Sequence, residues 1–162
     1  MFDAIFVNIT ATVLGGIILA LFFFILKEKV FAIADISGRW HFNMITAKTS
    51  YIPYQNMELR YVAVLWRESN KLYGSVEKIY EISSTGERPY TGKDRTRGEI
   101  SGIYEKNFFS KDKIYIHITE KGKERESTNY FTLSLQKKNL EGDFISFVAE
   151  QEGHSSWQRE HF

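Results

Sequence analysis

The sequence predicts an all-β protein, an eight-stranded antiparallel barrel that follows one N-terminal transmembrane helix. Two observations predict this fold class. An uncharged apolar run fills residues 4–26, and the chain beyond it breaks into short segments in which apolar and polar residues alternate. Because successive side chains of a strand point to opposite faces, such alternation is typical of strands with one buried face.

The apolar run is long enough to span a bilayer. At about 1.5 Å per residue its helix measures roughly 34 Å, whereas a hydrocarbon core is about 30 Å thick. A cleaved signal peptide is the alternative, because residues 32–34 resemble a cleavage site. Two features argue against a signal peptide. Asp3 makes the N-terminal end acidic where a signal peptide is basic, and the apolar run is longer than the apolar core of a signal peptide. We therefore expect a single-pass anchor.

Charges on either side of the run predict its orientation. Asp3 precedes it, and Lys27 and Lys29 follow it. Because Lys and Arg accumulate on the cytoplasmic side of membrane proteins, we expect the C-terminal domain in the cytoplasm.

Composition limits what lies beyond the anchor. We expect a helix and linker over residues 1–35, and one barrel domain over residues 36–162, because about 130 residues make one ordinary domain. The sequence contains no cysteine, which excludes disulfides and thiolate metal sites. Its formal net charge of +1 gives no sign of a DNA or RNA polymer as partner.

Eight alternating segments predict the strands, and each ends at turn residues. They occupy residues 38–47, 57–67, 71–82, 95–106, 112–120, 127–136, 139–150 and 154–160. The longest connection, residues 83–93, contains Gly86, Pro89 and Gly92, and residues 151–153 are expected to form a turn. Sequential strands with short loops favour an up-and-down barrel.

Two tryptophan motifs point to one kind of barrel. Gly38-x-Trp40 stands near the start of the first predicted strand, and Trp157-x-Arg159 stands in the last. Lipocalin-like barrels close their base with an arginine of the last strand laid across a tryptophan of the first, a cation–π contact. We therefore expect a lipocalin-like barrel.

No catalytic pattern is evident in the sequence. The four histidines, His41, His117, His154 and His161, have neither metal-ligand spacing nor a neighbouring nucleophile. A glycine-rich phosphate loop and a serine elbow are absent as well. We expect a protein that is not an enzyme and uses no metal or cofactor.

Residues suited to binding are more abundant. Lys93, Arg95 and Arg97 alternate, so they are expected to share one face at the start of the fourth strand. Arginine binds phosphates bidentately and aromatic rings stack on bases, so nearby tyrosines would suit a nucleotide. The alternative is a solvated edge strand whose charges prevent aggregation. The tyrosines concerned are Tyr51, Tyr54, Tyr80, Tyr90 and Tyr104.

The predicted membrane helix has a stripe of small and polar residues. Asn8, Thr12, Gly16 and Ala20 recur every four positions. Small residues let helices approach closely, and Asn or Thr can bond between them, which predicts a homo-oligomer. The alternative is background, because Gly, Ala and Thr are common in such spans.

Short motifs along the barrel resemble a known family. They are ISGRW at 36–40, SYIPY at 50–54 with Met57, GxxEKIY at 74–80, YxGKxR at 90–95, IxG at 100–102 and WxR at 157–159. In this order they resemble the transmembrane β-barrel effectors of bacterial CBASS antiphage systems, which contain the SMODS-associating, β-strand-rich effector domain. Familiar members have two predicted spans, whereas this sequence has one.

The resemblance implies a function. The barrel would bind a cyclic dinucleotide second messenger, made by a functionally linked nucleotidyltransferase. Binding would make the membrane segments associate and disrupt the bacterial inner membrane, an abortive-infection response. A related arrangement implies the opposite sign, in which bound cyclic nucleotide keeps the barrel silent until a phage depletes it.

Our leading hypothesis from the sequence assigns a role to each candidate residue. Lys78, Arg95 and Arg97 would lie near the phosphates, with Lys78 and Tyr80 on one strand face. The tyrosines expected on or beside the bases are Tyr51, Tyr54, Tyr80 and Tyr104. Two hypotheses stay open beside it: a membrane-tethered, lipocalin-like carrier of an apolar small molecule, and an assembly scaffold whose barrel is filled.

Overall fold

The computed structural model describes residues 2–27, 33–107, 109–122 and 125–162. The chain divides into two compact units, Met1–Asp35 and Ile36–Phe162, which are described separately.

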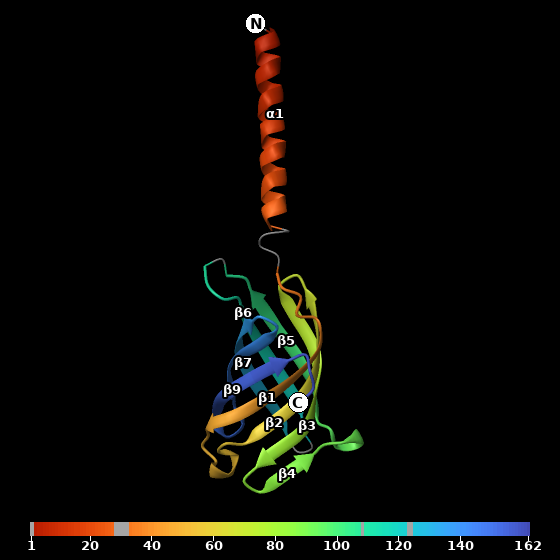
Figure 1. Cartoon of the computed structure of the whole chain (residues 1–162), viewed down its shortest axis with the longest axis vertical. Helices are drawn as coiled ribbons and strands as arrows, with labels where there is room; N and C mark the ends of the chain where they lie inside the picture. The colour runs from red at the N-terminus through yellow and green to blue at the C-terminus, as the bar shows by residue number, and fades with distance from the viewer. Residues whose placement is uncertain (1, 28–32, 108, 123–124) are drawn as a thin grey trace. The chain divides into compact units, whose positions relative to one another are not determined.

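The first unit contains helix α1, Phe2–Ile25 (Figure 1). Of the described residues, Ile5–Ile25 form the one helix long and apolar enough to cross a membrane. The hydroxyl groups of Thr10 and Thr12 donate to the carbonyl oxygens of Phe6 and Asn8 at 2.9 and 2.8 Å, so they are satisfied within the helix. Such internal bonding is what the water-free interior of a bilayer requires.

The second unit is built from nine strands joined by tight turns and three short 3-10 helices. The strands are β1 (Gly38–Lys48), β2 (Glu58–Glu68), β3 (Lys71–Ser83), β4 (Gly86–Pro89), β5 (Arg97–Glu105), β6 (Lys113–Lys121), β7 (Glu126–Gln136), β8 (Asn139–Ser146) and β9 (Gln151–Gln158). The 3-10 helices are η2 (Ile52–Tyr54), η3 (Gly92–Asp94) and η4 (Val148–Glu150).

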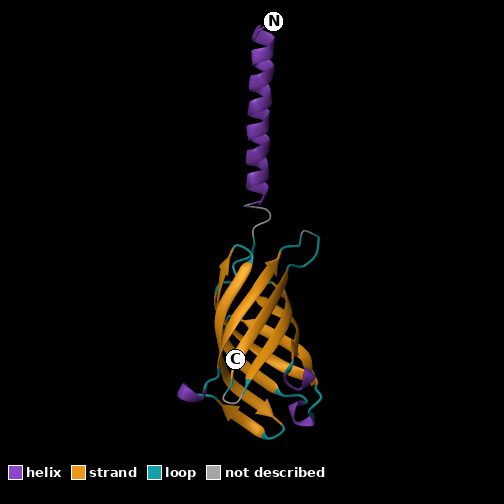
Figure 2. Cartoon of the chain, turned by 180° about the vertical axis from the view of Figure 1, so that it is seen from behind, coloured by secondary structure: helices purple, strands orange, loops and turns teal. Residues whose placement is uncertain are grey.

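Eight of these strands close into an antiparallel barrel (Figure 2). Its circuit runs β1, β2, β3, β5, β6, β7, β8 and β9, and β9 pairs with β1. Each strand therefore lies beside its neighbours in sequence, as in an up-and-down barrel. The predicted fold class, an eight-stranded barrel after one apolar helix, is confirmed.

The structure corrects the sequence prediction at two places. The long connection contains β4, a short strand that pairs with the end of β3 outside the circuit. Residues 151–153, expected to be a turn, belong to β9, and the chain reverses direction at residues 147–150 instead. Ala149 and Glu150 take φ values of 56° and 49° there. Neither residue type is typical of that conformation, so no turn signal marked the position.

Aromatic rings fill the barrel at the end where β1 begins, which we call the basal end. The rings of Phe42 and Trp157 stack at 3.9 Å, and the edge of Phe131 packs against both. Trp40 and Trp157 are at most 1% exposed. Stacked and edge-packed rings therefore occupy the interior of the barrel around Phe42, Phe131 and Trp157.

The predicted closure of the base is confirmed. The guanidinium of Arg159 lies 3.9 Å from the centre of the Trp40 ring, and it donates to the carbonyl oxygen of Arg39 at 3.0 Å. Gly38 has a φ of +104°, and a Cβ there would stand 3.1 Å from Nη1 of Arg159. The glycine of the motif thus allows both the backbone turn and the approach of the arginine.

Candidate ligand sites of the barrel

A small cavity opens inside the barrel at its apical end, opposite the basal end. Its volume is about 140 Å³, and polar side chains dominate its lining. The cavity has room for about five water molecules, whereas pockets for small-molecule ligands measure about 300–1,000 Å³. Its polar and charged lining residues include Tyr61, Lys78, Glu81, Glu120, Asn129 and Gln151.

Glu120 is the buried carboxylate of this cavity. It is 3% exposed, and Oε1 accepts hydrogen bonds from the Tyr61 hydroxyl at 3.0 Å and from Nδ2 of Asn129 at 3.1 Å. Burial raises the pKa of Glu120, and the nearby ammonium of Lys78 acts in the opposite direction. Nζ of Lys78 itself lies 5.9 Å from the ring centre of Tyr61 and 5.7 Å from that of Tyr90. The polar side chains of Tyr61, Glu120 and Asn129, which line the interior cavity, are therefore joined in one hydrogen-bond network.

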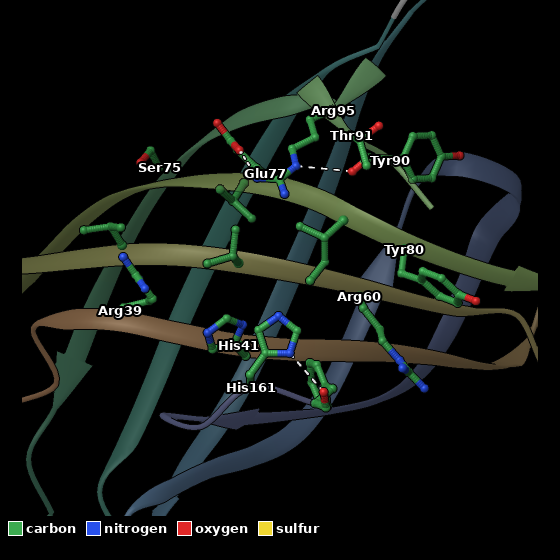
Figure 3. Close-up of a pocket in the computed structure, with 15 residues that line it drawn as sticks. Arg39, His41, Arg60, Ser75, Glu77, Tyr80, Tyr90, Thr91, Arg95 and His161 are labelled. Atoms are coloured by element: carbon green, nitrogen blue, oxygen red, sulfur yellow. Dashed lines mark hydrogen bonds and ion pairs between the residues drawn. The ribbon is translucent and has the colours of Figure 1, made fainter. Parts of the chain in front are cut away.

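A larger groove lies on the outer wall of the barrel (Figure 3). Its volume is about 620 Å³, within the range of ligand pockets. Strands β1, β2 and β3 form its floor, the segment after β4 forms one side, and the residues after β9 form the other. Its polar and aromatic lining residues are Arg39, His41, Arg60, Ser75, Glu77, Tyr80, Tyr90, Thr91, Arg95, His161 and Phe162.

Positive charge predominates in this outer groove. Three arginines line it, Arg39, Arg60 and Arg95, and Glu77 is the one carboxylate among its described lining residues. Arg60 is held between two rings, with its guanidinium 5.5 Å from the centre of Tyr80 and 5.4 Å from that of Phe162. Nε of Arg60 donates to Glu58 at 2.7 Å, which raises the pKa of the guanidinium. The groove thus combines fixed cations with aromatic faces.

Glu77 connects two of the predicted cations. Arg95 donates to Oε2 at 3.0 Å and Arg97 lies 3.2 Å from Oε1. Arg95 also donates to the carbonyl oxygen of Tyr90 at 3.2 Å, and the Tyr90 hydroxyl donates to Glu81 at 2.7 Å. Burial, followed by the bond to Glu81, raises the pKa of Tyr90 to about 12. Hydrogen bonds and ion pairs therefore fix the positions of Arg95 and Tyr90 in the wall of the groove.

His41 is the buried polar group of the groove. Its side chain is 7% exposed, and its Nδ1 has no hydrogen-bond partner in the described part of the chain. Its ring packs on that of His161 at 4.7 Å. Burial lowers the pKa of His41, and His161 and Arg39 lower it further. The His41 ring is part of the groove lining, whereas its unpaired Nδ1 is enclosed by protein atoms.

The structure brings together only part of the predicted binding set. Arg95 and Tyr80 line the outer groove, and Arg97 reaches its edge through Glu77. Lys78 and Tyr54 line the interior cavity instead. Tyr51 packs edge-on against Tyr54 at 5.0 Å in the apical loop.

The expectation that Lys78 and Tyr80 share a strand face is wrong. The β2–β3 register shifts between Arg60 and Tyr61, so that Tyr61 opposes Lys78 while Arg60 opposes Tyr80. Tyr61 faces the interior and Arg60 faces outward. The extra residue in β3 is a β-bulge, which turns Tyr80 to the outside.

Two further expectations are corrected. Tyr104 lies near the basal end, at the opposite end of β5 from Arg97, where it is 2% exposed and donates to Asp112 at 2.6 Å. Lys93 belongs to η3, and β5 begins only at Arg97, so the three cations do not alternate along one strand.

The groove lining also includes Arg39, His41, Arg60 and His161, which were not among the predicted binding residues. In β2, Arg60 alternates with the buried Leu59 and Tyr61, so its side chain is on the outward face. What the sequence could not reveal is that this face meets β1, β3 and the residues after β9 to form a hollow.

Comparison with known proteins adds no assignment: neither the models of protein families nor the curated protein sequences match this chain. The described residues also contain no cluster of three or more His, Asp or Glu side chains able to hold a metal ion.

Proposed function

We propose that the protein is a membrane-anchored antiphage effector whose cytoplasmic barrel binds a cyclic dinucleotide in the outer groove. The observation that supports this proposal is that three arginines and two tyrosines, Tyr80 and Tyr90, line the same hollow of about 620 Å³. No catalytic step is part of the proposal. A linked nucleotidyltransferase would supply the ligand, as the family resemblance implies.

The chemistry of the groove suits an anion that carries flat rings. Arginines bind phosphate oxygens through charge-assisted hydrogen bonds, and tyrosine faces stack on bases. The imidazole of His41 belongs to the groove lining and would lie beside such a ligand. Arg95 and Tyr80, both predicted from the sequence, belong to this site.

The interior cavity suits such a ligand poorly. It measures about 140 Å³, and the carboxylates of Glu81 and Glu120 both line it, so a cyclic dinucleotide would be excluded by size and its phosphates repelled by charge. The hypothesis of an apolar carrier also finds little support here, because aromatic rings occupy the space in which a carrier holds its cargo.

Ligand binding would control association of the α1 helices, and thereby the integrity of the inner membrane. Linkage requires that the ligand bind the associated and dissociated states with different affinity, and it allows either sign. Activation and silencing by cyclic dinucleotide are therefore both consistent with the groove. The stripe of Asn8, Thr12, Gly16 and Ala20 is the proposed contact between helices.

Calorimetry on the detergent-solubilised full chain tests the binding step. We expect at least one member of a panel of cyclic dinucleotides to bind. Arg60→Ala and Arg95→Ala should each weaken that binding by about tenfold or more, since a hydrogen bond to a charged group contributes about 1.5–3 kcal/mol. Lys48→Ala is the matched control, because Lys48 pairs with Glu152 on the other side of β1 and lies outside the groove.

Two results would reject the binding site. One is the absence of binding by every member of the panel, and the other is wild-type affinity in both arginine variants. A dye-leakage assay on vesicles, with and without the bound nucleotide, then tests the membrane step and gives the sign of control.

A further inference from the structure

A row of outward-facing side chains crosses five strands of the barrel wall away from the outer groove. In the strand registers, Trp66 opposes Tyr73, Tyr73 opposes Ser101, Ser101 opposes His117, and His117 opposes Tyr130. Each strand of this part of the wall thus contributes one residue to the row. All but Ser101 contribute a ring.

The rings form two stacks, one on each side of Ser101. Trp66 and Tyr73 stack with centres 6.4 Å apart and planes at 24°, and His117 and Tyr130 stack at 4.7 Å and 10°. The residue after Ser101 is Gly102, which is on the inner face of β5, so the small side chain of Ser101 is what leaves the outer row open. A hollow of about 520 Å³ lies over these two residues, and Tyr73, His117 and Tyr130 are part of its lining.

The gap in the row has the width of one ring. Neighbouring strands are about 4.8 Å apart, so Tyr73 and His117 stand roughly 9.5 Å apart across β5. A ring inserted midway would lie about 4.8 Å from each, a normal separation for stacked rings. It is also close to the 4.7 Å between His117 and Tyr130. One inserted ring would therefore join the two stacks.

The surroundings of the gap favour an uncharged ring. Of the described residues that line the hollow, only Lys71 carries a permanent charge. Ile103 and Tyr115, which oppose each other beside the gap, are 52% and 38% exposed and supply apolar surface. The Ser101 hydroxyl and the His117 imidazole can bond to ring heteroatoms.

From this geometry we infer that the gap over Ser101 is a binding site for a small, uncharged, planar heteroaromatic molecule of the nucleobase class. This site is separate from the outer groove, whose ligand must be anionic, and it does not rest on the proposed function. Added salt screens charges, so it should weaken the binding of an anion in the outer groove and leave the binding of an uncharged ring over Ser101 unchanged.

Equilibrium dialysis of the detergent-solubilised full chain with adenosine, guanosine, cytidine and uridine tests the inference. We expect saturable binding of at least one nucleoside, with an affinity that added salt leaves unchanged. Ser101→Tyr supplies the missing ring and should weaken binding by about tenfold or more, because stacking accounts for about that much per base.

Two further variants separate loss of the site from loss of the fold. Ser134→Tyr adds the same ring on β7 outside the hollow and should leave binding unchanged. His117→Ala removes one wall of the gap and should weaken binding by about tenfold even if Ser101→Tyr fails to fold. The inference is overturned if no nucleoside binds saturably, or if neither Ser101→Tyr nor His117→Ala weakens binding.

Discussion

In a lipocalin-like carrier the ligand is held inside the barrel, whereas in this protein the larger hollow is on the outer wall. The inside is filled by stacked rings at the base and closed by a small polar network at the apex. The outer wall has the groove of about 620 Å³, and the imidazole of His41 and three arginines are part of its lining. Because eight strands enclose just enough space for side chains or one small ligand, filling that space with rings leaves larger ligands only the outside. The comparison teaches that barrel topology alone does not locate a ligand.

The largest expected effect tests whether the inside is structural. Trp157→Ala removes a fully buried ring from the basal stack and should lower the free energy of unfolding by about 3–5 kcal/mol. Trp66→Ala is the matched control, because Trp66 is 48% exposed on the outer wall. This substitution should lower the free energy of unfolding by less than about 1 kcal/mol. Denaturant unfolding of the full chain in detergent, followed by near-UV circular dichroism, measures both. Equal losses would mean that the two faces contribute alike to stability.

The same contrast shows how far the sequence could lead. Alternation predicted the barrel because a closed sheet buries one face of every strand, and the tryptophan motifs predicted how its base closes. Lys78 and Tyr80 were assigned to one face because a bulge leaves no mark in a two-residue pattern. The hollow beside Arg60 was missed because it depends on the register of three strands and on where His161 and Phe162 come to lie.

A smaller effect tests the polar network at the apex. Burial raises the pKa of Glu120, so the folded state favours the protonated carboxyl. Stability from this group is then fully present below its ordinary pKa of 4.5 and is lost as the pH rises through the folded-state value. Glu120→Gln keeps an oxygen to accept from Tyr61 and Asn129, and it should stabilise the barrel by about 1 kcal/mol at neutral pH.

The pH dependence distinguishes this effect from a general change in packing. The advantage of Glu120→Gln over the wild type should shrink as the pH falls towards 4.5, when both side chains are neutral. Nucleotide binding in the outer groove should be unaffected by this variant. An advantage that stays constant with pH would show that the charge of Glu120 is not the cause.

The smallest expected effect concerns the imidazole of His41, which is part of the lining of the outer groove. Burial lowers the pKa of this imidazole below 6.5, so it is neutral in the ligand-free protein near that pH. An anion in the groove would favour the protonated form, and binding would then take up a proton. Affinity for a cyclic dinucleotide should therefore rise by about threefold as the pH falls through one unit below 6.5, within the tenfold limit for one proton.

A histidine on the opposite side of β1 gives the control for this prediction. His154 is exposed, lies 3.5 Å from Asp143, and does not line the groove. His154→Asn should preserve the rise in affinity, whereas His41→Asn should abolish most of it. If both single variants behave like the wild type, the imidazole of His41 does not contact the ligand.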